Sequence, residues 1–395
     1  MKTQAKILIS IFGLALAIIF FQKIFKDSSH VFSTHRNAGL QKEQFLENNA
    51  IKNDLNEASS RAAGYKTSVE EENENIKNIL SDFNQVRRME DWNGVVLFVK
   101  ADPKNNLMIY HHYNSDYRDS NSNGVQDDQD EGFFNPASTV KVSIAALVLE
   151  KLNYLGVERG AEYRELGSKQ WYSIFSDLEA ALVISSNEAT NRLILFLGFD
   201  FIRESLRSKG FENLSINRLM LDQGTHLSSP AFEIKYDGSI IFQPPQEAAS
   251  KIECFEAKDR IGNCASAADL VGVMARIVGP EHFPEKANFH FRDEDRFWLQ
   301  EIMAKTPREA GFGQEDNFCR FLQPLYEKKA FKSGRMLSKC GVGLFSHSYI
   351  DTSYIQTDDG ESYYTVFAIQ PPRYISKEEA TEWMNEVSEL ILSEL

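Results

Sequence analysis

The order of the apolar segments restricts the fold of this chain more than any other feature of its sequence. Two strand-like runs, 94–99 and 107–110, open the globular part and are separated by a turn that contains Pro and Asn. Apolar helical patterns follow, then strand-like runs at 344–356 and 363–369, and a closing amphipathic helix over 377–395. Strands at both ends with helices between them predict an antiparallel sheet flanked by helices, with a helical region inserted, which is an α/β (α+β) architecture.

Apolar periodicity also predicts the helices of the inserted region. We expect helices over 140–152, 174–184, 188–197 and 266–278. We divide the chain into an N-terminal segment over 1–26, a polar helical stalk or linker over 27–90 and a globular domain over 91–395. The stalk is rich in Glu, Asn and Lys, and its last part has an apolar helical face.

The N-terminus predicts contact with a membrane. Lys2 and Lys6 precede an apolar run over 7–21, and Lys23 and Lys26 follow it. The small residues of a cleavage site lie inside the apolar run, which favours an uncleaved anchor, with a cleaved signal peptide as the alternative. Both interpretations place the rest of the chain outside the cytoplasm, in the periplasm or on the cell surface.

Charge and cysteines restrict the partners and the compartment. The formal net charge is −14, so we do not expect a nucleic acid partner. There are four cysteines, without a C-x-x-C pair or a zinc-like spacing, at positions 254, 264, 319 and 340. An oxidising compartment would allow two disulfides. Pairing of 254 with 264 and of 319 with 340 is local in sequence, but other pairings and free thiols remain open.

Ser138 and Lys141 have the spacing of a nucleophile and its base. Residues three apart share one helix face, so the hydroxyl and the amine can come within hydrogen-bonding reach. A desolvated lysine with a depressed pKa can take the serine proton. The alternative is a helix N-cap followed by a surface lysine.

Two further motifs follow in the chain. Ser185-Ser186-Asn187 separates two apolar helical segments, where a hydroxyl can relay a proton and the Asn187 amide can hold a substrate amide. An N-cap for the second helix is the alternative. Lys332-Ser333-Gly334 is expected on an edge strand, with a positive charge, a hydroxyl and a glycine that allows close backbone approach.

These three motifs, in this order, resemble those of the penicillin-recognising serine hydrolases, and most closely those of class A β-lactamases. The resemblance implies a five-stranded antiparallel sheet flanked by helices, an all-helical subdomain and an active site between them. It implies that Ser138 is the acylated nucleophile, Lys141 its proton acceptor and Ser185 the proton shuttle.

The resemblance also assigns the substrate-binding groups. Asn187 would bind a substrate amide, Lys332 and Ser333 would recognise a carboxylate, and Gly334 would let the substrate approach. The oxyanion hole would be formed by the backbone N–H groups of Ser138 and Arg335. No cofactor is implied for catalysis.

The sequence departs from the class A pattern at the deacylation step. Class A enzymes carry a glutamate in an E-x-x-L-N context, and this chain has no such motif in the corresponding region. Asp222, which closes the R-x-M-x-D stretch 218–222, and Glu233 are the candidate bases, and each has a purely structural carboxylate as its alternative. Ser186 and Ser333 are milder departures, because Asp and Thr are the commoner residues there.

An acidic insertion over 119–130 has the spacing of a calcium loop. Oxygen-bearing side chains stand at loop positions one, three, five, nine and twelve, with glycine at position six. The ligands would be Asp119, Asn121, Asn123, Asp127 and Asp130. A structural calcium ion is therefore a hypothesis, and a flexible acidic loop is its alternative.

Together these features predict a membrane-anchored, extracytoplasmic serine hydrolase that forms an acyl-enzyme. The expected substrate is a β-lactam or a related peptidoglycan-derived amide or ester, and β-lactam hydrolysis is the leading activity. The alternatives are a D-alanyl-D-alanine peptidase or esterase, and a penicillin-binding sensor that stays acylated. A calcium-dependent surface interaction domain is the remaining non-enzymatic hypothesis.

Overall fold

A computed structural model gives the fold. It describes residues 66–69, 93–102, 107–115, 135–221, 228–248, 255–257, 260–313, 320–322, 335–343, 348–357, 360–371 and 374–394. No helix in this part of the chain is both long and apolar enough to cross a membrane. Residues 7–21 lie outside it, so the membrane anchor stays a prediction.

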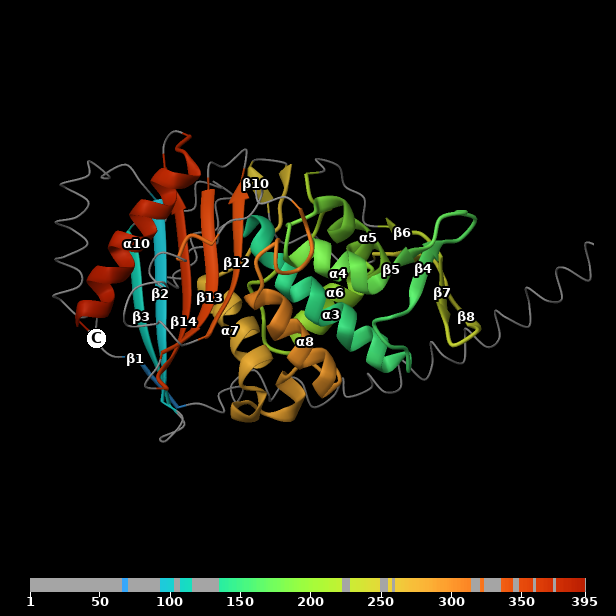
Figure 1. Ribbon diagram of the computed structural model, residues 1–395, viewed down its shortest axis with the longest axis horizontal. Helices are drawn as coiled ribbons and strands as arrows, with labels where there is room; N and C mark the ends of the chain where they lie inside the picture. Colours follow the sequence, from blue (N-terminus) through green and yellow to red (C-terminus); the bar gives the residue numbers. More distant parts are fainter. Residues whose placement is uncertain are drawn as a thin grey trace, which may run out of the picture.

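The main sheet is built from both ends of the chain, as the sequence predicts (Figure 1). Its strand order is β1-β3-β2-β14-β13-β12, and every neighbouring pair is antiparallel except β1 with β3. The strands are β1 (Lys66–Val69), β2 (Asn93–Asp102), β3 (Leu107–Ser115), β12 (Arg335–Gly343), β13 (Ser348–Gln356) and β14 (Ser362–Gln370). The hairpin expected over 94–110 is confirmed.

Strand β1 corrects two expectations. It adds a sixth strand to the predicted five, and it comes from the stalk or linker segment 27–90, in which we expected no strand. Residues 66–69 pair in parallel with β3, at the edge of the sheet. The rest of the expected stalk lies outside the described residues.

Helices cover both faces of this sheet. The helices are η4 (Ala137–Val140), α3 (Lys141–Tyr154), α4 (Ile174–Leu182), α5 (Asn187–Leu197), α6 (Phe199–Ser208), α7 (Ala267–Val278), α8 (Asp293–Ala304) and α10 (Lys377–Glu394). One core cluster joins α10 to the outer sheet face, and a larger one joins the other face to α3, α7 and α8. The four central helices and the closing helix that the sequence predicts are confirmed to within a few residues, whereas α6 and α8 were not predicted.

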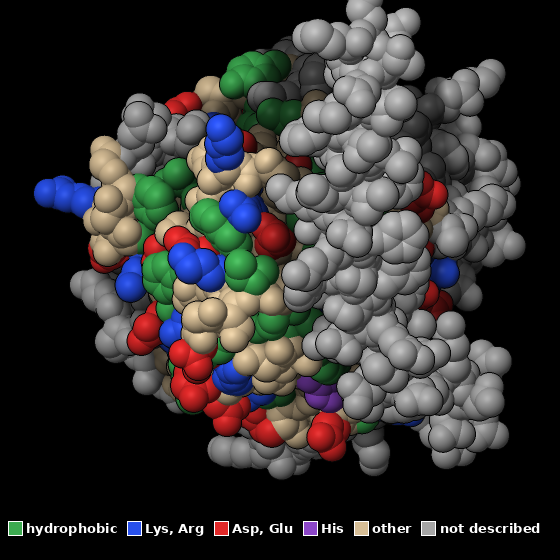
Figure 2. Space-filling view, turned by 90° about the vertical axis from the view of Figure 1, so that its right-hand side faces the viewer, with side chains coloured by type: hydrophobic (Ala, Val, Ile, Leu, Met, Phe, Trp, Pro, Cys, Tyr) green, Lys and Arg blue, Asp and Glu red, His purple; other side chains and the backbone are tan. Residues whose placement is uncertain are grey.

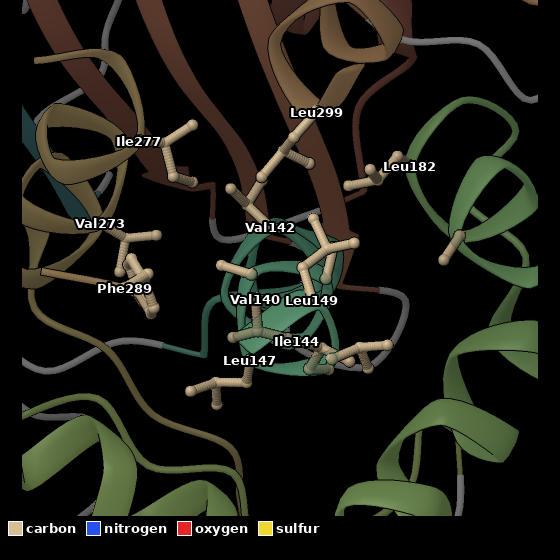
Figure 3. Close-up of a cluster of buried hydrophobic side chains, with 14 of the residues drawn as sticks. Val140, Val142, Ile144, Leu147, Leu149, Leu182, Val273, Ile277, Phe289 and Leu299 are labelled. Carbon is tan, nitrogen blue, oxygen red and sulfur yellow. The ribbon is translucent and has the colours of Figure 1, made fainter. Parts of the chain in front are cut away.

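Helix α3 is the centre of the larger core. Every residue from 141 to 152 is buried, so this part of the helix has no solvent face (Figure 3). Figure 3 shows its apolar side chains directed toward Leu182, Val273, Phe289 and Leu299 on the surrounding elements. A helix that is buried all round is held in place from every side. The first turn of α3 is therefore a rigid base for a reactive group.

A second, four-stranded sheet lies at the far end of the helical region and was not predicted. Its order is β5 (Tyr172–Ser173), β4 (Glu162–Glu165), β7 (Phe232–Tyr236) and β8 (Ser239–Gln243). Tyr163, Phe196 and Phe232 pack against one another beneath it. Two short two-stranded sheets complete the described strands, β6 (Ser228–Ser229) with β9 (Gln246–Glu247) and β10 (Phe255–Ala257) with β11 (Arg260–Ile261).

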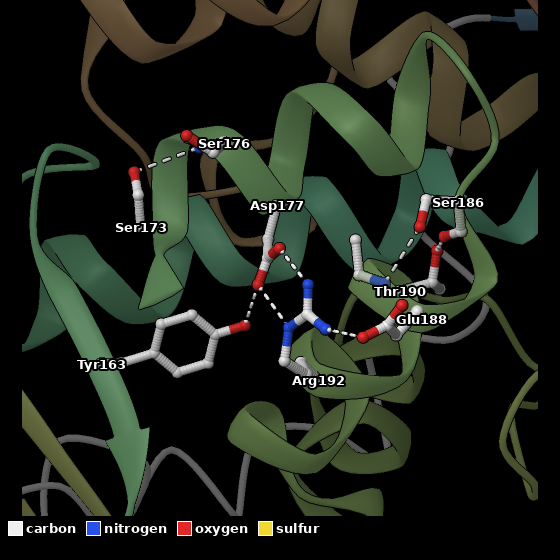
Figure 4. A network of polar contacts seen from close by, with 9 residues as sticks. Tyr163, Ser173, Ser176, Asp177, Ser186, Glu188, Thr190 and Arg192 are labelled. Carbon is white, nitrogen blue, oxygen red and sulfur yellow. Dashed lines mark hydrogen bonds and ion pairs between the residues drawn. The ribbon is translucent and has the colours of Figure 1, made fainter. Parts of the chain in front are cut away.

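A polar network fixes α4 relative to α5 (Figure 4). The buried Asp177 carboxylate accepts hydrogen bonds from the Arg192 guanidinium at 2.6 and 2.9 Å and from the Tyr163 hydroxyl at 2.7 Å. Arg192 also stacks on Tyr172 and bonds the exposed Glu188 at 2.9 Å. The turn between the two helices carries the Ser185-Ser186-Asn187 motif, so this network holds the motif in place.

The two acidic partners of Arg192 should differ in their contribution to stability. Asp177→Ala leaves a partly buried guanidinium and a buried tyrosine hydroxyl without their shared acceptor, and should lower the free energy of unfolding by roughly 3 kcal/mol. Glu188→Ala removes only the exposed half of the network and should cost about 0.5 kcal/mol or less. Urea unfolding of both variants measures the difference, and equal effects would show that the network does not stabilise the α4–α5 corner.

Candidate active site

Ser138 lies in the short helix η4, directly before α3. Ala137 has a φ of 47° and its backbone N–H donates to the Asn135 carboxamide at 2.9 Å. The Thr139 backbone N–H and hydroxyl both donate to the Pro136 carbonyl, at 3.0 and 2.6 Å. These bonds form a tight turn that lifts Ser138 to the surface of the buried helix, where it stays partly exposed.

Strand β12 meets this turn at Gly341. A Cβ at Gly341 would lie 2.7 Å from the backbone nitrogen of Ser138 and 3.1 Å from the carbonyl oxygen of Pro136. Both neighbours are backbone atoms, so a side chain there would force the sheet away from the nucleophile. Only glycine allows β12 to pass this close to Ser138.

Lys141 is fully buried and points at the turn between α4 and α5. Its Nζ donates to the Ser185 carbonyl at 2.6 Å, the Asn187 carboxamide oxygen at 2.8 Å and the Ser185 hydroxyl at 3.1 Å. Burial, together with the nearby charge of Lys339, holds the pKa of Lys141 well below its usual value. The neutral amine of Lys141 can keep donating to the Ser185 carbonyl and to the Asn187 carboxamide oxygen, which can only accept. It can take a proton through its contact with the Ser185 hydroxyl, since a hydroxyl can also donate.

Lys339 on β12 completes the constellation from the sheet side. Its Nζ donates to the Ser185 hydroxyl at 3.0 Å and to the Cys340 carbonyl at 3.0 Å. Burial lowers the pKa of Lys339 to about 7, against an opposing effect of Asp351. Two buried lysines thus converge on one hydroxyl, which accepts from both and can pass on its own proton.

The position of Lys339 corrects the assignment of the strand motif. Lys339-Cys340-Gly341 occupies the place that we expected for Lys332-Ser333-Gly334, and those three residues lie outside the described residues. Two alternate residues of a strand share one face, so Lys339 and Gly341 reach the site together. The motif therefore has a cysteine where we expected a serine hydroxyl.

The new position of the strand motif also changes which residue of β12 is expected to donate to the oxyanion. Arg335 begins β12, six residues before Gly341, which is about 20 Å along an extended strand. Its guanidinium donates to the Gln300 carboxamide at 3.0 Å instead. The structure therefore does not bring Arg335 to the nucleophile turn, and Val342 is the residue that follows the Lys-x-Gly motif. Ser138 keeps its place in the assignment.

The turn Ser185-Ser186-Asn187 combines the two interpretations of its sequence, a helix N-cap and a source of catalytic contacts. Ser186 caps helix α5, since its hydroxyl accepts from the Ala189 backbone N–H at 3.2 Å. Ser185 has a φ of 56°, a left-handed conformation that is uncommon for a residue with a side chain. Its carbonyl and its hydroxyl both receive bonds from Lys141. The N-cap interpretation thus applies to Ser186, while Ser185 and Asn187 contact the buried lysine.

Asn191, one turn after Asn187 on α5, holds a loop residue that the sequence did not indicate. Its carboxamide donates to the Met220 carbonyl at 3.2 Å and accepts from the Met220 backbone N–H at 2.6 Å. Asn187 and Asn191 are four residues apart, about 6 Å along the helix axis. Met220 is therefore fixed on the side of α5 that carries the contact with Lys141.

Of the two candidate deacylating carboxylates, the structure describes only Glu233. Asp222 lies outside the described residues and remains a prediction. Glu233 is on β7, at the opposite end of the helical region from β12, and its carboxylate bonds Arg164 at 2.6 Å (Figure 1). That end of the molecule displays acidic and basic side chains next to one another (Figure 2). The structure therefore holds Glu233 in an ion pair with Arg164, and it does not bring this carboxylate to the two lysines.

The remaining predicted sites fall mainly outside the described residues. The calcium loop over 119–130 is not among them, so a structural calcium ion stays a prediction. In the described ranges no three His, Cys, Asp or Glu side chains come together as metal ligands. Cys264 and Cys340 are both disulfide-bonded, whereas Cys254 and Cys319 lie outside the described residues.

Comparison with known proteins identifies the class of this fold and site. The family model described as the β-lactamase enzyme family matches residues 108–395. The chain therefore belongs to the β-lactamase enzyme family and is a serine hydrolase of that family. No curated protein is similar enough in sequence to match it.

Solved structures share the fold at low sequence identity. A structure of the L158E mutant of PBP-A, an acyl-enzyme complex with penicillin G, is 17% identical with a TM-score of 0.54. The match covers 83% of this chain and all of that chain. The chromosome-encoded β-lactamase of Vibrio parahaemolyticus is 14% identical with a TM-score of 0.51, over 80% of this chain and 97% of that one.

The pKa of Lys141 should govern the pH dependence of the site. A base must be neutral, so the rate at which Ser138 is acylated should fall as the pH drops through the lowered pKa of Lys141. Lys141→Arg, whose guanidinium does not deprotonate in proteins, should reduce the rate by about 100-fold or more at every pH. Rates of acylation by a fluorescent penicillin between pH 5 and 9 measure both effects.

Lys151 offers a matched control for this experiment. It lies on the same helix, and burial lowers its pKa to about 7, but its amine bonds the Phe196 and Leu197 carbonyls at 2.7 and 3.0 Å. Lys151→Met should therefore lower stability and leave the shape of the pH profile unchanged. A Lys141→Arg variant with the wild-type profile would rule out Lys141 as the base.

Proposed function

We propose that this chain is a membrane-anchored, extracytoplasmic serine hydrolase that is acylated on Ser138 by β-lactams and hydrolyses them. The observation that carries the proposal is the convergence of two buried lysines on the Ser185 hydroxyl, beside the nucleophile turn. Burial lowers the pKa of both lysines, as a catalytic amine requires, and, unlike Lys151, they share a hydroxyl partner beside Ser138. The family to which the chain belongs and the penicillin acyl-enzyme of PBP-A support the choice of substrate.

The geometry assigns a role to each group during acylation. Neutral Lys141 takes the proton of Ser138 as its Oγ forms a bond to the lactam carbonyl carbon. Backbone N–H groups of Ser138 and of β12 stabilise the oxyanion. The lactam C–N bond then breaks, the nitrogen takes the Ser185 proton, and protonated Lys141 restores it. Lys339 keeps the Ser185 hydroxyl oriented throughout.

A specific observation favours slow deacylation as the second candidate, in which the protein is a penicillin-binding sensor or a D-alanyl peptidase or esterase. The loop residue that Asn191 holds near the lysine contacts is Met220, which has no group that could activate water. Activation of water by a general base contributes about 100- to 10,000-fold in rate. The acyl-enzyme would then persist unless another group, such as Asp222, supplies the base.

The location of the protein is part of the same proposal. Peptidoglycan-derived substrates lie outside the cytoplasm, and the apolar run over 7–21 between lysines would tether the domain on that side. Disulfide-bonded Cys264 and Cys340 agree with an oxidising compartment. Fractionation of cells that express the full chain, followed by protease treatment of intact spheroplasts, tests the anchor and its orientation.

Acylation of Ser138 is the central prediction. Intact-mass spectrometry after addition of benzylpenicillin should show one covalent adduct on the wild-type protein, mapped to the peptide that contains Ser138. Ser138→Ala should show none. Ser143→Ala, which removes a buried hydroxyl from helix α3, is the matched control and should be acylated at the wild-type rate. Absence of an adduct on the wild-type protein would remove the proposed function.

Position 220 should control the lifetime of the adduct. Met220→Glu places a carboxylate at the point where Asn191 fixes the loop, and should speed deacylation by about 100-fold if it can activate water. Met220→Gln introduces a side chain of nearly the same shape as glutamate but without its charge, and should leave the lifetime of the adduct unchanged. Decay of the adduct by mass spectrometry measures both. Equal lifetimes in the two variants would show that this position does not face the acyl group.

A further inference from the structure

A disulfide-bonded cysteine stands at the centre of the catalytic strand. Cys340 lies between Lys339, which contacts the Ser185 hydroxyl, and a glycine that passes close to the nucleophile turn. The carbonyl of Cys340 also accepts from the Lys339 amine at 3.0 Å. Among the described strands β12 is hydrogen-bonded only to β13, so the sheet holds it from one side. A covalent bond at Cys340 therefore acts where the position of this strand matters most for the site.

The side chain of Cys340 lies on the face of the sheet that α10 covers. It is 3% exposed and belongs to the core cluster that joins the sheet to this helix. Asp351 on β13 is its cross-strand partner, and directly opposed residues carry their side chains on the same face. The Asp351 carboxylate accepts from the Phe321 backbone N–H at 2.9 Å, and Phe321 and Leu322 belong to the same cluster. The segment 320–322 therefore lies beside Cys340.

This arrangement indicates which cysteine is the partner of Cys340. Cys319 stands two residues before Phe321 in the sequence. Two residues of chain span at most about 7 Å, and a disulfide needs its Cα atoms roughly 4.4 to 6.8 Å apart. Cys319 is therefore within reach of Cys340.

The other two cysteines are suited to bond each other. Cys264 leads into α7, which packs on the opposite face of the sheet from α10. The β10–β11 hairpin pairs Phe255 with Ile261, so the chain before Phe255 is opposed to the residues that follow Ile261. Cys254 and Cys264 occupy these two places in the sequence. A bond between them leaves the remaining two cysteines as the second pair.

The segment beside Cys340 is itself anchored to helices on both faces of the sheet. The Phe321 carbonyl accepts from the Asn385 carboxamide of α10 at 2.9 Å. The Arg320 guanidinium donates to two carbonyls at the end of α8, at 3.1 and 3.0 Å. A disulfide from this segment to Cys340 thus fastens the edge strand to a fixed part of the fold.

We propose that Cys340 is a positioning residue and that Cys319 is its disulfide partner. The bond holds Lys339 and Gly341 where acylation requires them, so Ser138 reacts rapidly only while the bond is intact. This inference rests on the proposed acylation of Ser138. Formation of the bond passes two electrons and two protons to a disulfide donor of the oxidising compartment, which leaves as a dithiol. The chain therefore gains its full activity only after it has left the reducing cytoplasm.

The test measures acylation of the full-length protein by benzylpenicillin before and after treatment with dithiothreitol. A displacement of about 1 Å can cost about 100-fold in rate, so reduction should slow acylation at saturating penicillin by about 10- to 100-fold. Reoxidation with oxidised glutathione should restore the rate. Peptide mapping without reduction should show Cys319 linked to Cys340.

Two double variants separate the effects of the two disulfides. Cys319→Ala with Cys340→Ala should be acylated slowly from the outset and should not respond to dithiothreitol. Cys254→Ala with Cys264→Ala is the matched control, because it removes the other two cysteines and keeps the proposed bond. It should be acylated at the wild-type rate and should still slow on reduction. All rates are measured below the melting temperature of each protein.

A wild-type acylation rate that reduction leaves unchanged would overturn the proposal, even if reduction lowers the melting temperature, because the bond would then only stabilise the fold. Linkage of Cys340 to a cysteine other than Cys319 would also overturn it, as would a response to dithiothreitol in the variant that lacks both. Absence of an adduct on the oxidised wild-type protein would instead refute the proposed function.

Discussion

The contact between Gly341 and the backbone of Ser138 is the constraint on which the rest of the site depends. It joins the edge strand of the sheet to the short helix η4, which leads into the buried helix α3, with no room for a side chain between them. Because strand residues alternate, this contact also directs Lys339 to the same face, where it meets the Ser185 hydroxyl. The close contact between the backbones of Gly341 and Ser138 thus sets the positions of the nucleophile, the sheet lysine and the turn between α4 and α5.

The energetics of the site favour function over stability. Lys141 and Lys339 are both buried, and their charged forms repel each other and are poorly solvated. The surrounding structure compensates with obligate acceptors, which are the Ser185 carbonyl, the Asn187 carboxamide and the Cys340 carbonyl. The Asp177–Arg192 network then holds the turn that supplies the first two. The result is a pair of amines that lose their protons far more easily than exposed lysines.

The sequence predicted the parts of the fold and site that depend on local patterns. Ser138 and Lys141 follow from helical spacing, and Ser185 and Asn187 from a polar turn between two apolar helices. The structure brings Lys141, Ser185 and Asn187 into contact, as expected. Strand and helix order likewise predicted the main sheet and its closing helix.

The predictions that the structure does not support depended on strand register and on contacts between residues that are far apart in the sequence. Lys332 and Lys339 both precede a glycine by two residues, and the sequence does not show which one reaches Ser138. We assigned Lys332-Ser333-Gly334 for its positive charge, its hydroxyl and its glycine. The alternation of Leu337, Lys339 and Gly341 toward α3, with Met336 and Cys340 toward α10, emerges only from packing on both sheet faces. Glu233 looked like a loop carboxylate because its partner Arg164 is 69 residues away in sequence.

Asp351 connects the main chain next to Arg320 with the electrostatics of Lys339. It holds the backbone beside Arg320, and its charge raises the pKa of Lys339 against the effect of burial. Arg320 in turn lowers the pKa of Asp351, which burial raises. Charged Lys339 in turn lowers the pKa of Lys141. The charge of Lys339 therefore affects how easily Lys141 becomes the neutral amine that can remove the Ser138 proton.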